Sequence, residues 1–245
     1  MDTIVAKITN DSLTDKKIYE QAGKILREGG LVAFPTETVY GLGADALDEE
    51  ASAKIYAAKG RPSDNPLIVH IADIEALYKL SCEVPDKALK LADKFWPGPL
   101  TMILKKSDIV PDSITGGLGT VAIRMPSHKV AAELIRTSGV YIAAPSANTS
   151  GKPSPTRASH VIKDLSGKID MIIEDDTVDI GVESTIIDLS EEVPTILRPG
   201  YITKEMFEEV IGGVRIDPAI TEGVKSGVVP KAPGMKYKHY APDAD

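Results

Sequence analysis

Cysteine, tryptophan and phenylalanine are scarce in this chain of 245 residues, which has one cysteine, one tryptophan and three phenylalanines. With Cys82 alone the chain cannot form an internal disulfide, which fits a reducing compartment. A zinc site at Cys82 is disfavoured, because no second cysteine accompanies it and the four histidines are scattered. We therefore expect Cys82 to behave as a small, partly buried apolar residue.

Long apolar runs and an excess of positive charge are also missing. No run approaches the roughly 20 apolar residues that cross a bilayer, and the N-terminus lacks the basic-then-apolar order of a signal peptide. The net charge is −8 and the pI is near 5.1, which disfavours a broad nucleic-acid-binding face but leaves room for a small basic pocket. These absences predict a soluble, cytoplasmic protein.

What the chain does contain is the pattern of an α/β fold, with short β-branched runs alternating with amphipathic stretches. Hydrophobic residues make up 42% of it, enough for a substantial core. We predict strands over residues 3–8, 31–34, 67–71, 100–104, 120–125, 141–144, 171–173, 185–189 and 195–198. Helices are predicted over residues 15–28, 49–59, 86–95, 129–137, 157–165 and 204–210.

The composition changes near the end of the chain. From Gly212 onward long periodic segments are lost, and the last stretch is rich in proline, lysine and tyrosine. We therefore divide the chain into a domain over residues 1–211 and an extended linker or tail over 212–245. Two readings of the tail stay open, one in which it dangles and one in which it folds over a site.

A polar cluster follows the buried strand that ends at Pro35. Thr36 and Thr38 supply hydroxyls, Glu37 a carboxylate, and two nearby glycines allow close backbone approach. Ligands of open α/β folds gather at the carboxyl ends of strands, so this segment is a candidate site. The alternative is an ordinary strand-to-helix turn with capping threonines.

Two cations leave the end of the helix predicted at 49–59. Lys59 offers a point charge and Arg61 a planar fork, and the break at Gly60 and Pro62 frees both to face one polyphosphate. The alternative is a pair of cations that only stabilise a helix C-terminus.

Three further basic residues lie within apolar strands. His70 is either a hydrogen-bonded core residue or a group facing a cleft, since alternation places it opposite Leu67, Val69 and Ile71. Arg124 and Arg198 each close a strand, and a charge there requires a partner or an anionic ligand.

The loop that follows the strand at 141–144 is the most informative. It carries Ser146, Asn148, Ser154, Gly151 and Lys152, so it offers many hydrogen bonds to one ligand. It is not a P-loop, because the glycine and lysine are followed by proline, and no Rossmann G-x-G-x-x-G, G-x-S-x-G or H-E-x-x-H motif is present. If ATP binds, side chains and irregular loops must hold it. The segment that begins at Glu183 says little by itself.

Together these segments resemble the YrdC/Sua5 family of threonylcarbamoyl-AMP synthases. The resemblance runs from about Gly29 to the tail, and its paired signature, K-x-R with S-x-N, is present as Lys59/Arg61 and Ser146/Asn148. The remaining carrying stretches cover residues 35–43, 62–67, 183–186 and 197–200. The tail resembles the linker of Sua5-type members, whose second C-terminal domain we expect to be absent here.

The resemblance implies a YrdC-like twisted mixed sheet flanked by helices, with a large concave basic cavity. It implies that threonine is surrounded by Thr36, His70, Arg124, Ala144 and Ser184. It implies that the nucleotide, with Mg²⁺ on its phosphates, is held by Lys59, Arg61, Ser63, Thr120, Ser146, Asn148, Ser154 and Arg198. It also implies that the linker folds back with Tyr237, His239 and Tyr240.

The implied reaction joins L-threonine, bicarbonate and ATP into L-threonylcarbamoyl-AMP and pyrophosphate, and the product passes to the machinery that makes t6A in tRNA. Such a transfer depends on positioning and charge neutralisation, which fits a chain with many cations and hydroxyls but no evident nucleophile. We expect Lys59 and Arg61 as the catalytic cations on the phosphates and Arg124 on the threonine carboxylate. The alternatives are an RNA-binding module with a basic cavity and a carbamoyl-adenylate-forming relative from hydrogenase maturation.

Overall fold

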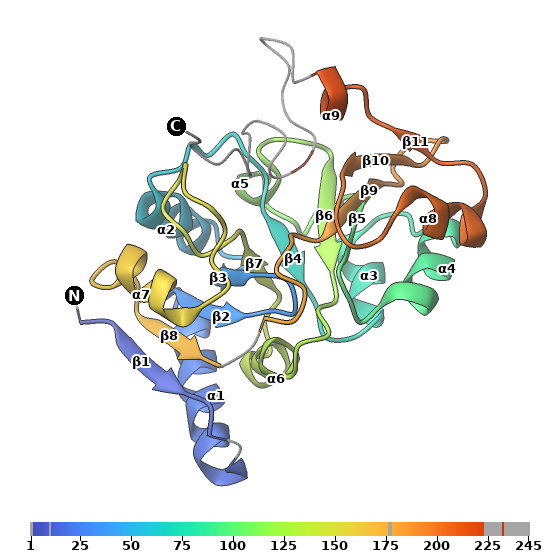
Figure 1. The fold of residues 1–245 in the computed structure, drawn as a ribbon. Coiled ribbons are helices and arrows are strands. Elements are labelled where there is room, and N and C mark those ends of the chain that lie inside the picture. Colours follow the sequence, from blue (N-terminus) through green and yellow to red (C-terminus); the bar gives the residue numbers. More distant parts are fainter. Residues whose placement is uncertain (1, 10, 176–177, 223–231, 233–245) are drawn as a thin grey trace, which may run out of the picture.

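A mixed β-sheet runs through the centre of the molecule (Figure 1). The computed structural model describes residues 2–9, 11–175, 178–222 and 232. Within these residues the sheet has the order β1-β8-β2-β3-β7-β4-β6-β5-β9-β10-β11. The strands are β1 Ile4–Lys7, β2 Val32–Pro35, β3 Tyr40–Asp45, β4 Ile68–His70, β5 Leu100–Lys105, β6 Thr120–Arg124, β7 Ile142–Ala144, β8 Met171–Glu174, β9 Thr185–Asp188, β10 Thr195–Arg198 and β11 Arg215–Ile216.

Helices flank this twisted sheet, as predicted (Figure 1). They are α1 Ser12–Arg27, α2 Glu49–Lys59, α3 Glu75–Leu80, α4 Asp86–Phe95, α5 Asp112–Thr115, α6 Lys129–Ser138, α7 Ala158–Leu165, α8 Lys204–Ile211 and α9 Ala219–Glu222. Among the described residues, no helix combines the length and the apolar character needed to cross a membrane.

The core lies on both faces of the sheet, and strand β2 shows why. Val32 and Phe34 pack with Leu26 of α1 and Leu134 of α6 on one face, while Ala33 belongs to the larger cluster on the other. Alternate residues of a strand point to opposite faces, so a strand covered on both faces is apolar throughout. The sheet therefore places its strand ends, rather than its faces, within reach of a ligand.

Helix α2 has clear signals at both ends, and these position the first candidate cations. The Asp48 side chain accepts hydrogen bonds from the backbone N–H groups of Glu50 and Ala51, which satisfies donors at the helix start. Gly60 ends the helix in the left-handed conformation at φ 61°, which glycine adopts at little cost. The chain consequently turns sharply between Lys59 and Arg61.

No strand was predicted over residues 40–45, and the alternative of a strand-to-helix turn after Pro35 was wrong. These residues form β3, which pairs antiparallel with β2 through the register Pro35↔Tyr40, so the polar turn at 36–39 joins two strands. A Cβ on Gly43 would lie 2.6 Å from Ile142 Cγ2 and 2.8 Å from Phe34 Cε1. The glycine is needed for close packing, and glycine weakens the sequence signal of a strand.

Smaller differences have local causes. Helix α1 begins three residues before the predicted start because the Asp11 carboxylate accepts a hydrogen bond from the Thr14 backbone N–H. Helices α3, α5 and α9 were not predicted, since each is short and offers little periodicity. Cys82 is exposed rather than partly buried.

The sheet also continues beyond residue 211, the boundary predicted from composition. Strand β11 pairs parallel with β10 through Thr195↔Arg215 and Ile196↔Ile216. Two residues of pairing give no periodic signal, so the sequence alone read this stretch as tail. Tyr237, His239 and Tyr240 of the predicted linker lie outside the described residues.

Candidate functional site

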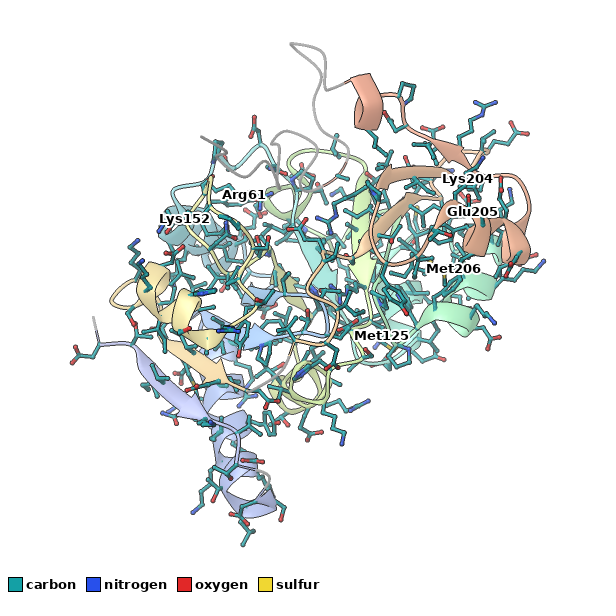
Figure 2. All side chains as sticks on the ribbon, viewed as in Figure 1. Arg61, Met125, Lys152, Lys204, Glu205 and Met206 are labelled. Carbon is teal, nitrogen blue, oxygen red and sulfur yellow. The ribbon has the colours of Figure 1, made fainter. Side chains whose placement is uncertain are left out.

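Eight of the predicted site residues converge on one hollow. It measures about 500 Å³ including its open mouth, within the usual range for ligand pockets. Its walls come from the β2–β3 turn, from β4, β6 and β10, and from the loops after α2 and β7. The predicted residues that line it are Thr36, Arg61, His70, Arg124, Ala144, Ser146, Ser184 and Arg198. Figure 2 shows Arg61 on the side where α2 ends, well away from Lys204, Glu205 and Met206 of α8.

Arg124 forms a buried charge pair deep in this hollow. Its Nη2 lies 2.8 Å from Glu37 Oε1, and both side chains are about 95% buried. Its Nη1 donates to Thr38 Oγ1 at 3.0 Å. Its Nε has no hydrogen-bond partner among the described residues, which is unusual for a buried donor. The guanidinium is thus anchored from the β2–β3 turn and retains capacity for an anion.

Glu37 remains a carboxylate despite its burial. Burial is the largest single influence and raises the pKa of Glu37, but the charge of Arg124, its side-chain hydrogen bond and backbone hydrogen bonds together hold the pKa below its usual value. The pair therefore brings one positive and one negative charge into the protein together, which limits the cost of burying either.

The β2–β3 turn is fixed by its own hydroxyls. Thr36 Oγ1 donates to the Val39 carbonyl at 2.7 Å and accepts from the backbone N–H groups of Thr38 and Val39 at 3.2 Å. It also lies 2.9 Å from Thr38 Oγ1. The turn is consequently a rigid support for Arg124, in addition to lining the hollow.

His70 combines the two alternatives considered for it, because it lines the hollow and is also bonded within the core. Its Nδ1 lies 3.1 Å from the Ile68 carbonyl. A carbonyl only accepts, so Nδ1 carries the proton and Nε2 is left as an acceptor. Burial, and then the charge of Arg124, lower the pKa of His70 to about 3. The ring is therefore neutral at physiological pH.

A second cluster joins β9 to the end of β10. Arg198 Nε donates to the Ser184 carbonyl at 3.0 Å, and its Nη2 donates to Ser184 Oγ at 3.0 Å. Its Nη1 donates to Glu183 Oε2 at 2.8 Å, and Ser154 Oγ donates to Glu183 Oε1 at 2.7 Å. Ser184 Oγ lies 2.7 Å from Thr101 Oγ1. Glu183 thus connects Ser154 and Arg198, two residues predicted to hold the nucleotide.

Lys59 occupies a different place from Arg61. Its side chain is buried and donates to the carbonyl oxygens of Ser146 and Asn148 and to Asn148 Oδ1. Arg61 is only half-buried and lines the hollow, as Lys59 does not. The break at Gly60 therefore separates the two cations instead of bringing them onto one ligand face.

Some predicted residues are not brought to the hollow. Ser63 is exposed and Thr120 is half-buried at the start of β6, and neither belongs to the lining that the described residues form. Asn148 and Ser154 border the hollow through their bonds to Ser146 and Glu183. Tyr237 and Tyr240 lie outside the described part of the chain, so their assignment stays a prediction.

Sequence reasoning missed several of the connecting groups. Glu37 and Thr38 were noted as polar but were given no role, Glu183 was set aside, and Thr101 was not considered. Thr101 sits in an otherwise apolar strand, where a hydroxyl needs a partner, and this was the one usable signal. The others become evident only when distant strands are brought together.

The hollow has an unusual charge for this acidic chain. Its lining includes three arginines, Arg61, Arg124 and Arg198, against one carboxylate, Glu183. Two other surface hollows of about 880 and 870 Å³ are larger. Neither gathers predicted site residues, so we assign the site by its chemistry rather than by its size. Such a lining suits a ligand with several negative charges.

Comparisons with known proteins point to one family. Residues 24–200 match the Sua5/YciO/YrdC family model, described as telomere recombination. Residues 202–245 match the model of the threonylcarbamoyl-AMP synthase C-terminal domain.

Individual relatives agree with these matches. The chain is 57% identical to a threonylcarbamoyl-AMP synthase of Pyrococcus abyssi, over 99% of this chain and 70% of the relative. It is 54% identical to a threonylcarbamoyl-AMP synthase of Bacillus subtilis, over 97% and 68%. The solved structure of P. abyssi Sua5 complexed with L-threonine matches with a TM-score of 0.92 and 55% identity, covering 100% of this chain and 70% of that one.

Proposed function

Because the chain belongs to the Sua5/YciO/YrdC family, we propose that it condenses L-threonine, bicarbonate and ATP into L-threonylcarbamoyl-AMP and pyrophosphate. The observation that carries the proposal is the hollow itself, where an anchored guanidinium, Arg124, lies in one lining with a second group of cations and hydroxyls. An amino acid carboxylate and a nucleoside triphosphate require two such anion-binding groups in one site. The product serves t6A formation in tRNA, and the reaction takes place in the cytoplasm.

Arg124 is the group suited to the threonine carboxylate. Its guanidinium is buried, is held in place by Glu37 and Thr38, and has an Nε without a hydrogen-bond partner among the described residues. His70 offers a neutral acceptor, and Thr36 and Ser184 offer hydroxyls, while the small side chain of Ala144 leaves room. Threonine therefore binds in the buried part of the hollow.

The first chemical step requires positioning more than activation. The threonine ammonium loses a proton to solvent, and its nitrogen then forms a C–N bond to the carbon of bicarbonate with release of water. The residues around threonine orient the amine and hold the resulting carbamate close to the nucleotide.

In the second step a carbamate oxygen bonds to the α-phosphorus of ATP. The bond from that phosphorus to the bridging oxygen breaks, and pyrophosphate leaves. Arg61 and Arg198 oppose the negative charge of the phosphates, and the Ser146 loop helps to fix the nucleotide. No covalent enzyme intermediate is needed.

Mg²⁺ fits this site as an ion carried by ATP rather than as an ion caged by protein. Among the described residues no group of three or more His, Cys, Asp or Glu side chains could hold a metal, and the one carboxylate in the lining, Glu183, is engaged by Ser154 and Arg198. Mg²⁺ commonly keeps water and phosphate ligands. When bound, it neutralises phosphate charge.

The test is an omission experiment. The protein is mixed with Mg-ATP, L-threonine and bicarbonate, each component is left out in turn, and the adenylate and pyrophosphate are measured by mass spectrometry and a coupled assay. We expect both products only in the complete mixture. Pyrophosphate release that does not depend on threonine and bicarbonate would refute the proposal, as would nucleotide-independent RNA binding without any turnover.

A further inference from the structure

Thr101 carries a buried hydroxyl group in an otherwise apolar strand. It lies in β5 between Leu100 and Met102, which belong to the core, and it is fully buried. Among the described residues, its Oγ1 has one hydrogen-bond partner, Ser184 Oγ, at 2.7 Å. A buried hydroxyl proton needs an acceptor, and Ser184 Oγ is the acceptor within reach. Thr101 therefore donates this hydrogen bond and Ser184 accepts it.

Ser184 Oγ accepts a second hydrogen bond. Arg198 Nη2 donates to it at 3.0 Å, and a guanidinium can only donate. Because a hydroxyl oxygen has two lone pairs, Thr101 and Arg198 together use its capacity as an acceptor. The contacts of Ser184 Oγ with the described residues thus leave its proton for a group in the hollow, which Ser184 lines.

Each of the other hydroxyl groups in the lining donates its proton to an oxygen of the protein itself. These donors are Thr36 to the Val39 carbonyl, Thr38 to Thr36 Oγ1, Tyr40 to the Asp175 carbonyl and Ser146 to Asn148 Oδ1. The contact between Thr36 and Thr38 takes its proton from Thr38, because the proton of Thr36 is already used. Within the described part of the chain, Ser184 is therefore the lining hydroxyl whose proton is available to a ligand.

We propose that Thr101 is a positioning residue, which fixes Ser184 as a hydrogen-bond donor to an anionic oxygen of the bound amino acid. The inference rests on the proposed function for the identity of that amino acid, while the direction of the hydrogen bond between Thr101 and Ser184 stands without any ligand. A donor suits a carboxylate or carbamate oxygen and does not suit an ammonium group, which can only donate. His70 offers an acceptor in the same hollow, so the two ends of an amino acid are distinguished.

The hydrogen bond is tested first in the free protein, by nuclear magnetic resonance. In mixed H₂O and D₂O, a hydroxyl group that exchanges slowly gives separate signals of its Cβ for the two isotopes. We expect such a split signal at Thr101, because its proton is held by Ser184. The splitting should collapse in Ser184→Ala, which removes the acceptor. A single averaged signal at Thr101 in the wild type, or a splitting that persists in Ser184→Ala, overturns the inference.

Threonine affinity, measured by calorimetric titration, is the second part of the test. Thr101→Val keeps nearly the same shape but has no hydroxyl, so the Ser184 proton is no longer directed to the hollow. Threonine should then bind about three- to tenfold more weakly, the net effect of one hydrogen bond. If Ser184 instead donated to Thr101, the valine would free its proton for the ligand. Unchanged or tighter threonine binding in Thr101→Val therefore overturns the inference.

Thr101→Ser separates this role from packing. It keeps the hydroxyl and loses a buried methyl, so it should unfold at a lower denaturant concentration and still bind threonine within about twofold of the wild type. A packing role predicts the reverse order, because valine keeps both branches of the side chain and serine does not. Threonine binding as weak in Thr101→Ser as in Thr101→Val overturns the inference. The matched control is Thr115→Val, which removes a buried hydroxyl of α5 that donates to the Asp112 carbonyl and should leave threonine affinity unchanged.

A double variant shows whether Thr101 acts through Ser184. Ser184→Ala should weaken threonine binding at least as much as Thr101→Val, and combining the two should cause little further loss, because both residues serve one interaction. Losses that add in full overturn the inference. If Thr101→Val does not fold, the resonance measurement on the wild type and Ser184→Ala still tests the hydrogen bond. Absence of adenylate synthesis by the wild type would refute the proposed function alone, because none of these measurements uses ATP.

Discussion

The side of the hollow that we propose for threonine and the side that we propose for the nucleotide are built in different ways. Thr36, His70 and Arg124 are buried on strands or in a hydrogen-bonded turn, and Ser184 is buried directly before β9. Arg61, Ser146, Ser154 and Arg198 are half-buried at loops and strand ends. The buried side has its orientation fixed before any ligand arrives, which suits a small amino acid. The outer side relies on loops held by polar networks, which suits the larger, charged nucleotide that we propose it admits through the mouth.

The largest effect is expected on the buried side. Arg124→Met should weaken threonine binding about 100-fold, because truncating one partner of a buried charge interaction costs several kcal/mol. It should also destabilise the fold by about 3–5 kcal/mol, since Glu37 is left as an unpaired buried carboxylate. Calorimetric titration with threonine and denaturant unfolding measure the two effects.

A double variant separates these effects. In Arg124→Met/Glu37→Gln most of the stability should return, because neither charge is left unpaired, while threonine binding should stay weak. If the double variant binds threonine like the wild type, Arg124 is not the carboxylate receptor.

A smaller effect is expected where the two sides meet. Glu183→Gln removes the charged partner of Arg198 and should raise the dissociation constant for ATP about tenfold, with little change for threonine. Glu83→Gln is the matched control. It breaks an exposed ion pair in which Glu83 Oε2 lies 2.8 Å from Lys105 Nζ, the same distance as in the Glu183–Arg198 pair. It should change neither the affinity for ATP nor the affinity for threonine. An equal loss of affinity for ATP and for threonine in Glu183→Gln would show that the two sides of the hollow do not act separately.

The smallest effect concerns pH. Because burial and Arg124 lower the pKa of His70 to about 3, this histidine should not titrate between pH 6 and 8. The dissociation constant for threonine should then change less than about twofold over that range. This is small beside the roughly tenfold change in an equilibrium constant that one pKa unit represents. A histidine-like transition near pH 6.5 in the binding titration would contradict a neutral His70.

The same histidine affects stability at lower pH. The unfolded chain takes up a proton at His70 below about pH 6.5 and the folded protein does not until about pH 3. Between these values the stability contributed by His70 falls as the pH falls, by up to about 1.4 kcal/mol per pH unit. In His70→Gln, this part of the pH dependence of the unfolding free energy should be lost, as measured by denaturant unfolding at several pH values.

The sequence was sufficient for the secondary structure wherever the local signals were strong. Helices α2 and α4 have the predicted bounds, because an apolar stripe and clear stop signals agree along each of them. Strand β3 was missed because its two glycines weaken the sequence signal of a strand. Glycine is needed there because β3 packs closely against β7 and β2. Local patterns carry no information about such close approaches.

The same limit applies to the site. That Arg124 needs a partner followed from its place in an apolar strand, but the identity of the partner, Glu37, depends on a pairing 87 positions apart that only the fold creates. The different directions of Lys59 and Arg61 depend on the φ angle of Gly60. Residue types therefore predicted which side chains belong to the candidate site, and the tertiary structure decided which of them face the hollow.

The position of β8 has a consequence for the nascent chain. This strand lies between β1 and β2 and pairs with both, through Ile4↔Met171 and Val32↔Met171. At a synthesis rate of about 5–20 residues per second, β1 waits on the order of ten seconds or more before its partner leaves the ribosome. We expect this end of the sheet to close late, and a ribosome-bound chain that stops before residue 171 to leave β1 open to proteolysis.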